Sequence, residues 1–254
     1  MWKLIRVAIL LLILATVAQT AWLDQKRATA WQDPLRVAIY PINADGSDAT
    51  ETYLRSLTQE TFSPIAAYMD EEAARHGRKL SRSLDVVLAP KVSALPPAPP
   101  PHASQVEAIM WSLKMRYWAW KHGSISGFRP QVRLFVLYFD PQLKASLPHS
   151  TALQKGLVGL VNAFASQSMA GSNRVVITHE LLHTLGATDK YEPGSNQPQY
   201  PDGFAEPAKQ PLYPQTFAEI MGGRIPISET ASQIPPALAA TTIGPKTAAE
   251  IGWR

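Results

Sequence analysis

The feature that most constrains this chain is the segment from Thr178 to Tyr191, which reads THELLHTLGATDKY. It places His179 and His183 four residues apart in a stretch whose apolar residues recur at helical spacing. On a helix, this spacing turns the second imidazole only about 40° from the first, one turn further along. Both rings can then bind one Zn²⁺, for which neutral imidazole is a good ligand. The segment therefore predicts a helix that carries a pair of metal ligands.

The residues next to this pair complete a hydrolytic metal site. Glu180 follows the first histidine and is expected beside the metal, which suits a base that acts on water. Tetrahedral zinc needs a third protein ligand if one position is left for water. Gly186 can end the helix and reverse the chain, so that Asp189, three residues later, swings back to the metal. The pattern HExxHxxGxxD predicts one catalytic Zn²⁺ bound by His179, His183 and Asp189.

Other roles stay open for single residues of this region. Asp189 can also cap a loop, bind a structural cation or hold Tyr191, and Gly186 can serve as a helix cap and as part of the metal site at once. The other histidines lack metal-ligand spacing and are expected in surface or packing positions; they are His76, His102, His122 and His149.

With these residues the chain resembles the metzincin metallopeptidases, which combine an extended zinc-binding helix, a glycine turn, a third ligand and a downstream methionine turn. Most members use a third histidine. Asp189 is similar to the aspartate of snapalysin-type peptidases, and the segment is similar to the HExxHxxGxxDxY pattern of immune-inhibitor-A-type peptidases. The resemblance implies that Met221, within AEIMGG, forms the methionine turn beneath the zinc. Gly223 occupies the position where some relatives carry a tyrosine, so Tyr191 and Tyr213 are the candidates for an oxyanion or supporting role.

The resemblance also implies the fold and the reaction. We expect an α+β fold, a metzincin-like zincin domain with a twisted mixed sheet, long helices and a loop-rich C-terminal subdomain that ends in a helix. The expected activity is endopeptidase hydrolysis of a peptide or protein substrate by zinc-activated water, with Glu180 as the general base. In metzincins the edge strand before the zinc helix binds the substrate in extended form. Residues 156–165 can take that role or form an ordinary buried strand.

Apolar patterning places further elements along the chain. Strands are expected near 35–39, 84–89 and 132–139, and a final helix is expected from Pro245 to Ile251. A long helix from about Ala103 to Gly123 carries an apolar stripe that we expect to face the core, formed by Val106, Ile109, Met110, Leu113 and Tyr117.

The N-terminus indicates export. Residues 7–18 are almost wholly apolar and follow Lys3 and Arg6, which fits a membrane anchor or a cleaved signal peptide. No good cleavage site follows, so we expect residues 1–23 to anchor the protein in a membrane, with the catalytic domain on the periplasmic or extracellular face. If the segment is cleaved, the protein is secreted. Residues 24–34 are then a linker, and residues 35–254 form the peptidase domain, divided into an upper (35–186) and a lower part (187–254).

Composition excludes several classes of function. The chain has no cysteine, which excludes disulfide scaffolds, thiolate metal sites and cysteine nucleophiles. Its formal charge is +4, but residues 1–27 carry four basic residues and one aspartate, so little net charge remains elsewhere. A nucleic-acid partner is therefore not expected.

Two competing functions remain at this stage. A gluzincin-type peptidase would take its third ligand from a downstream glutamate such as Glu219 or Glu250. A non-catalytic binding or assembly protein could keep a zincin fold, although such a protein has no need of Glu180 as a base.

Overall fold

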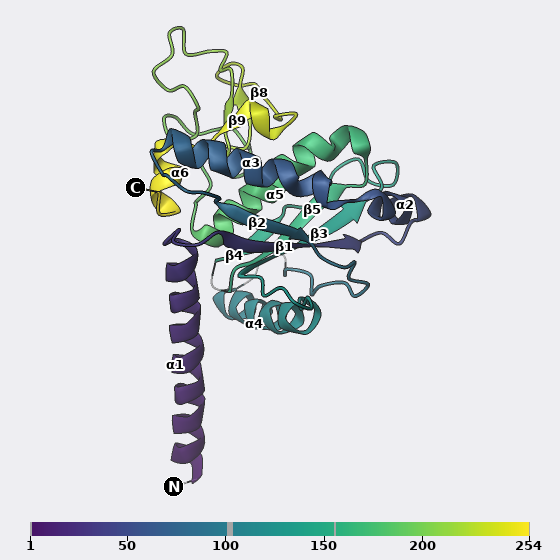
Figure 1. The fold of residues 1–254 in the computed structure, drawn as a ribbon, viewed down its shortest axis with the longest axis vertical. Coiled ribbons are helices and arrows are strands. Elements are labelled where there is room, and N and C mark those ends of the chain that lie inside the picture. Colours follow the sequence, from purple (N-terminus) through teal and green to yellow (C-terminus); the bar gives the residue numbers. More distant parts are fainter. Residues whose placement is uncertain (1, 101–103, 155, 254) are drawn as a thin grey trace.

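Five strands form one mixed sheet in the order β2-β1-β3-β5-β4 (Figure 1). In the computed structural model, which describes residues 2–100, 104–154 and 156–253, the strands are β1 (Leu35–Asn43), β2 (Leu84–Leu88), β3 (Val132–Phe139), β4 (Thr151–Leu153) and β5 (Val158–Phe164). The strands β2, β1, β3 and β5 are parallel, and β4 is antiparallel to β5. The expected α+β fold with a mixed sheet and several helices is confirmed, and strand β3 has the predicted bounds.

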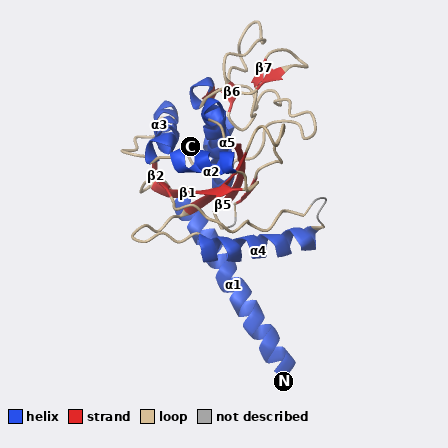
Figure 2. Cartoon of the chain, turned by 90° about the vertical axis from the view of Figure 1, so that its right-hand side faces the viewer, coloured by secondary structure: helices blue, strands red, loops and turns tan. Residues whose placement is uncertain are grey.

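Helices cover both faces of this sheet, as Figure 2 shows. One face packs against α3 and α5, and the other packs against α4. The α-helices are α1 (Trp2–Ala28), α2 (Asp48–Ser56), α3 (Gln59–Arg75), α4 (Gln105–His122), α5 (Ala170–Leu185) and α6 (Pro245–Glu250). Two short 3-10 helices are Gln167–Met169 and Leu238–Ala240.

Successive side chains of each strand point to opposite faces of the sheet, which explains why both faces are packed against helices. In β1, Val37 and Ile39 belong to the cluster shared with α3 and α5, whereas Ala38 and Tyr40 belong to the cluster shared with α4. Successive side chains of a strand point to opposite faces, so an unbroken apolar run is buried only between two layers. This sandwich fixes α5, the helix that carries the histidine pair, against β5, with further contacts to β4 and β3.

The long helix α4 is present, but the face predicted to be buried is wrong. The predicted stripe is exposed; it consists of Val106, Ile109, Met110, Leu113 and Tyr117. Trp111, Met115 and Ala119 are buried against the sheet instead. The helix has apolar residues on all sides, so more than one of its faces could be buried in the core. The small Ala119 side chain lets the helix lie close to the sheet on the face that is buried. On the same face, Trp111 Nε1 donates a hydrogen bond to the Pro97 carbonyl (2.9 Å).

The segment 156–165 contains strand β5, which lies inside the sheet. Residues Val158 to Leu160 pair with β3 on one side and with β4 on the other. The edge strand beside α5 is therefore the short β4, which the sequence pattern did not indicate. Three residues are too few for apolar alternation to identify a strand.

The expectation of a membrane anchor at residues 1–23 is wrong. Among the helices that the structure describes, none combines the length and the apolar character needed to cross a bilayer. The strictly apolar run 7–18 has twelve residues, or about 18 Å of helix against roughly 30 Å of hydrocarbon. The predicted membrane-anchored location depended on this segment and is therefore also wrong.

The residues expected to form a linker, 24–34, continue α1 and then enter the core. Helix α1 projects from the rest of the molecule and ends at Ala28 (Figure 1). Ala28 and Trp31 are buried, and Trp31 Nε1 donates a hydrogen bond to the Ile251 carbonyl (2.7 Å). The Trp31 ring also packs on Trp253, with ring centres 5.4 Å apart. These contacts fasten the end of α1 to the C-terminus.

After α5 the chain is rich in loops, as expected, and it ends in α6, whose first residue is Pro245. Four two-residue strands organise these loops into two small pairs: β6 (Ala218–Glu219) with β9 (Thr241–Thr242), and β7 (Ile225–Pro226) with β8 (Ser232–Gln233). The β6 strand leads directly into the turn at Met221, which lies beside α5.

Candidate metal centre

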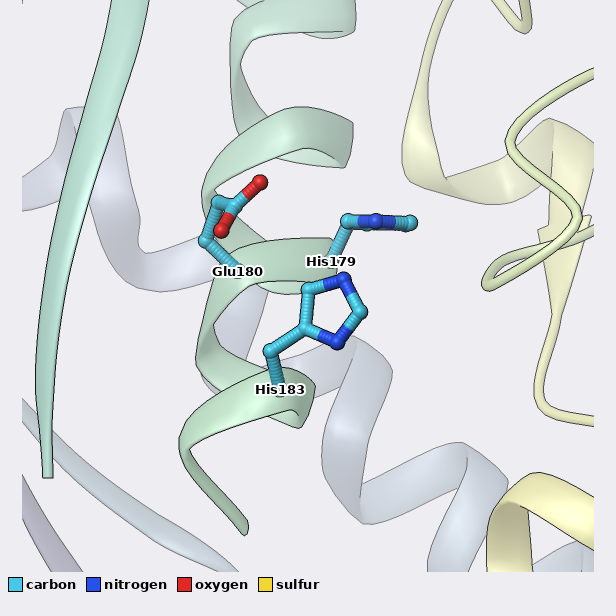
Figure 3. Close-up of side chains that lie close together, drawn as sticks. All are labelled: His179, Glu180 and His183. Carbon is cyan, nitrogen blue, oxygen red and sulfur yellow. The ribbon is translucent and has the colours of Figure 1, made fainter. Parts of the chain in front are cut away.

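The histidine pair lies on α5, where the imidazole rings of His179 and His183 come together (Figure 3). Each ring has its Nδ1 against a backbone carbonyl: His179 against Ile220 (2.9 Å) and His183 against Ala187 (2.8 Å). A carbonyl oxygen only accepts, so both Nδ1 atoms carry a proton, and both Nε2 atoms face the Asp189 carboxylate. The rings are therefore oriented with Nε2 toward the place where a metal ion could be held.

Asp189 joins this pair through the turn predicted at Gly186. Gly186 ends α5 in a left-handed conformation (φ 112°), which a glycine adopts without a side-chain clash. The chain then reverses, and Asp189 Oδ1 lies 3.2 Å from His179 Nε2 and 3.1 Å from His183 Nε2. One carboxylate oxygen thus lies at nearly the same distance from both imidazole nitrogens.

The distances from Asp189 to the two histidines are short enough for one metal ion to contact all three side chains. Two ligand atoms about 2.0–2.1 Å from one zinc ion lie roughly 3.4 Å apart at a tetrahedral angle. The Asp189–histidine distances of 3.1 and 3.2 Å are close to that value. With neutral imidazoles, all three converging atoms are electron-pair donors, and a cation satisfies them together. The cluster of His179, Glu180 and His183, whose ligand atoms all lie within 4.8 Å, can hold a metal ion.

The contact between Asp189 and the histidines shifts the pKa values of the groups in this cluster. Burial works against protonation of His179, but the neighbouring Asp189 carboxylate outweighs it and raises the pKa of the imidazole. Burial likewise works against ionisation of Asp189, yet its hydrogen bonds to the two histidines hold the pKa of the carboxyl well below its usual range. Asp189 is therefore ionised at neutral pH and gives the cluster a negative charge.

Glu180 belongs to the same cluster, and its side chain lines two cavities. Its side chain is buried, and among the described residues its Oε2 has no hydrogen-bond partner. Burial raises the pKa of this carboxyl, although His179 and His183 oppose the shift. A buried carboxylate with a raised pKa and a free oxygen suits a group that takes a proton and gives it back.

The loop that carries Asp189 is held by α6. Glu250 accepts hydrogen bonds from the Thr188 amide (3.0 Å) and hydroxyl (2.8 Å), and it forms an ion pair with the buried Lys190 (2.8 Å). The Lys190 amide in turn donates to the Met221 carbonyl (2.9 Å). Both neighbours of Asp189 are thus fixed. Glu250, one of the two glutamates considered as a third ligand, serves this contact instead.

The other glutamate, Glu219, stabilises the turn at Met221. Its fully buried carboxylate accepts hydrogen bonds from the amides of Gly222 (2.9 Å) and Gly244 (3.0 Å) and from the Thr247 hydroxyl (2.6 Å). The turn therefore has a fixed shape and presents the Ile220 carbonyl to His179. Met221 is fully buried in the core cluster that includes residues of α5.

The two candidate tyrosines lie in different places. The Tyr191 ring is stacked near His179, with ring centres 6.3 Å apart, and it lines the cavity at the metal cluster. Burial and the Asp189 charge raise the pKa of Tyr191 to about 12, so its hydroxyl stays protonated and can donate a hydrogen bond. The Tyr213 ring packs on Phe204, and Tyr213 is not among the described residues that line the cavities at the cluster.

Two cavities meet at this cluster. One has about 510 Å³ and includes His183, Asp189 and Tyr191 in its lining; the other has about 310 Å³ and includes His179. Both are lined by Glu180, Ser150 and His149. The smaller cavity has a mainly apolar wall formed by Leu147, Phe164, Val175, Val176, Ile220 and Ile234. An extended peptide that occupied both cavities would pass next to Glu180, which lines both of them.

Sequence patterns missed His149, which was assigned to a surface or packing role. It is exposed and lies just before β4, in a segment held by Asn162 of β5. Asn162 Nδ2 donates to the carbonyls of Pro148 (3.3 Å) and His149 (3.1 Å), and its amide donates to Ser150 Oγ (3.0 Å). Only the pairing of β4 with β5 brings His149 to the cavities, so no local signal identifies it.

No protein-family model matches this chain, and no curated protein matches it. Among solved structures, a crystal structure of wild-type OgpA from Akkermansia muciniphila is similar over 85% of this chain and 59% of the OgpA chain. The two sequences are 12% identical and the TM-score is 0.38. A similarity of this strength carries no argument about the fold family or the activity of the present chain.

Proposed function

We propose that this protein is a zinc-dependent endopeptidase of metzincin type, with His179, His183 and Asp189 as metal ligands. The observation that carries the proposal is the convergence of two Nε2 atoms and one carboxylate oxygen at distances that fit tetrahedral zinc. The neighbouring Glu180, with its free buried oxygen, supports catalysis over a purely structural metal site. When bound there, Zn²⁺ supplies Lewis-acid chemistry: it acidifies water and polarises a peptide carbonyl.

The protein side chains divide the remaining work. Glu180 takes a proton from the attacking water as the oxygen–carbon bond forms, and it gives that proton to the amine nitrogen as the carbon–nitrogen bond breaks. Tyr191, whose hydroxyl stays protonated, and His149 both line the larger cavity, and each can donate a hydrogen bond to the carbonyl oxygen of the substrate. Buried Glu219 and partly exposed Glu250 keep the turn and the ligand loop in position.

Strand β4 is the proposed docking strand for the peptide. Thr151 and Ala152 of β4 line the larger cavity, and β5 pairs with one side of the strand. An extended peptide can add to the other side through main-chain hydrogen bonds, with one side chain in the apolar smaller cavity. This arrangement favours a peptide or an unfolded protein as the substrate.

The experiment compares the parent with Glu180→Gln in zinc content and in cleavage of an unfolded protein. We expect both to bind one zinc ion, and we expect turnover by the variant to fall by about two to four orders of magnitude, the usual effect of losing a general base. Full activity of Glu180→Gln would refute the mechanism. A parent that binds zinc but cleaves no peptide bond would favour a non-catalytic binding protein.

A further inference from the structure

A third cavity lies where the end of α1 meets the starts of β1 and β3. It has about 370 Å³ and is lined by Arg27, Arg36, Arg129 and Arg133, and Asp24 is the one acidic side chain among the described residues of its wall. Four guanidinium groups and one carboxylate leave an excess of three positive charges around this space. Its lining residues are separate from those of the two cavities at the metal cluster.

The four cavity arginines differ in their ion pairs from some of the other basic side chains of the described chain. Several of those are paired with carboxylates within 4.0 Å; they are Arg75, Arg82, Lys91, Lys190, Lys209 and Lys246. None of the four cavity arginines has such an ion pair with a described carboxylate. Like charges that share one cavity repel one another, and a bound anion relieves that repulsion.

The sheet holds two of the four arginines in place. Arg36 lies on β1 and Arg133 on β3, and these strands are parallel neighbours. Arg133 Nε donates a hydrogen bond to the Gly123 carbonyl (3.0 Å). The Arg36 backbone is bonded to Gln131 in both directions, through its amide (3.1 Å) and its carbonyl (2.8 Å). Side chains that start from fixed positions lose less entropy when they bind a ligand.

We propose that this cavity is a binding site for a phosphate-bearing anion. A phosphate monoester carries a charge of about −1.5 to −2 at neutral pH, which matches an excess of three positive charges better than a single carboxylate does. The planar guanidinium fork binds phosphate oxygens in pairs, which a lysine ammonium cannot do. The volume lies within the roughly 300–1,000 Å³ range of small-ligand pockets.

The test is calorimetric titration of the full chain with inorganic phosphate and with pyrophosphate. We expect saturable binding that weakens as salt is added. Arg36→Gln and Arg129→Gln should each lower the affinity by about tenfold or more, because each removes hydrogen bonds to a charged group. Both side chains are exposed, so these variants should fold. Arg55→Gln is the matched control, since Arg55 is an exposed arginine of α2 that bonds to Thr52 (3.1 Å); it should bind like the parent.

Vesicles separate the two sources of such a phosphate group. Binding of the free anions identifies a soluble ligand. Binding only to phosphatidylglycerol vesicles, absent with phosphatidylcholine and lost in Arg36→Gln and Arg129→Gln, identifies a lipid headgroup. The proposal is wrong if neither probe binds, or if both variants bind as tightly as the parent. Because these residues lie outside the metal cluster, the outcome does not depend on peptidase activity.

Discussion

Glu250 is the side chain through which α6 controls the metal-binding loop, so Glu250→Ala should reduce both stability and zinc affinity. The side chain of Lys190 is 3% exposed and that of Glu250 is 20% exposed. Without Glu250, the buried Lys190 ammonium keeps, among the described residues, only its hydrogen bond to the Thr188 carbonyl (2.9 Å). Removing one partner of a buried ion pair lowers the free energy of unfolding by about 3–5 kcal/mol. We expect about 3 kcal/mol, the lower end, because Glu250 is partly hydrated.

Lys246→Ala provides the matched control on the same helix. Its ion pair with Asp202 is equally short (2.8 Å), but the two side chains are 54% and 44% exposed. Exposed pairs contribute about 0–1 kcal/mol, so this variant should unfold at nearly the same urea concentration as the parent. Zinc affinity of Glu250→Ala should fall about 10- to 100-fold, the usual effect of losing a partner that orients a ligand.

Urea unfolding and competitive zinc titration of both variants measure these two effects. The two expected effects are separate, and each has its own contradicting result. If Glu250→Ala and Lys246→Ala lose the same unfolding free energy, the ion pair of Glu250 with buried Lys190 does not stabilise the protein more than an exposed ion pair does. Unchanged zinc affinity in Glu250→Ala would show that the loop positions Asp189 without this helix.

Three further predictions concern the site. Asp189→Ala should weaken zinc binding and abolish activity, whereas Asp189→His should restore part of the zinc binding. Metal titration of both variants measures the zinc affinity. If Asp189→Ala binds zinc as tightly as the parent, Asp189 is not a ligand. His149→Ala should lower kcat/KM for peptide cleavage by about 10²-fold without changing the zinc content. His122→Ala, at the end of α4, is the control and should keep the parent kcat/KM. If His149→Ala cleaves peptides as fast as the parent, His149 has no part in the mechanism. Burial opposes ionisation of Glu250, but the hydrogen bonds of Lys190 and Thr188 outweigh it and lower the pKa of this carboxyl in the folded state. Its contribution to stability is therefore present above the unfolded pKa of about 4.3 and is lost as pH falls through the folded pKa. Urea unfolding at pH 7 and at about pH 4 measures how much unfolding free energy is lost on acidification. This loss should be smaller in Glu250→Ala than in the parent, and equal losses would contradict the prediction.

Local patterns predicted the elements that depend on neighbouring residues. The apolar run of β3 gave both of its bounds, and Gly186 marked the turn after α5. The four-residue spacing of His179 and His183 placed both rings on one side of that helix. Each of these features is set by periodicity or by one residue's backbone freedom, which the sequence displays directly.

Features that depend on distant residues were not predictable in the same way. Glu250 holds Thr188 across 62 positions in the sequence. His149 reaches the cavities only because β4 pairs with β5. Helix α4 has two apolar stripes, and only contact with the sheet decides that Met115 faces inward and Leu113 outward. The predicted anchor failed because the almost wholly apolar run covers only residues 7–18, so α1 lacks the apolar length that a span requires.

A crystal structure of the zinc-loaded protein, with anomalous scattering at the zinc edge, tests the central claim most directly. We predict one zinc ion bound by His179 Nε2, His183 Nε2 and the Asp189 carboxylate at about 2.0–2.2 Å. A zinc ion bound at another site, or one that draws Glu219 or Glu250 into its coordination in place of Asp189, would contradict the account.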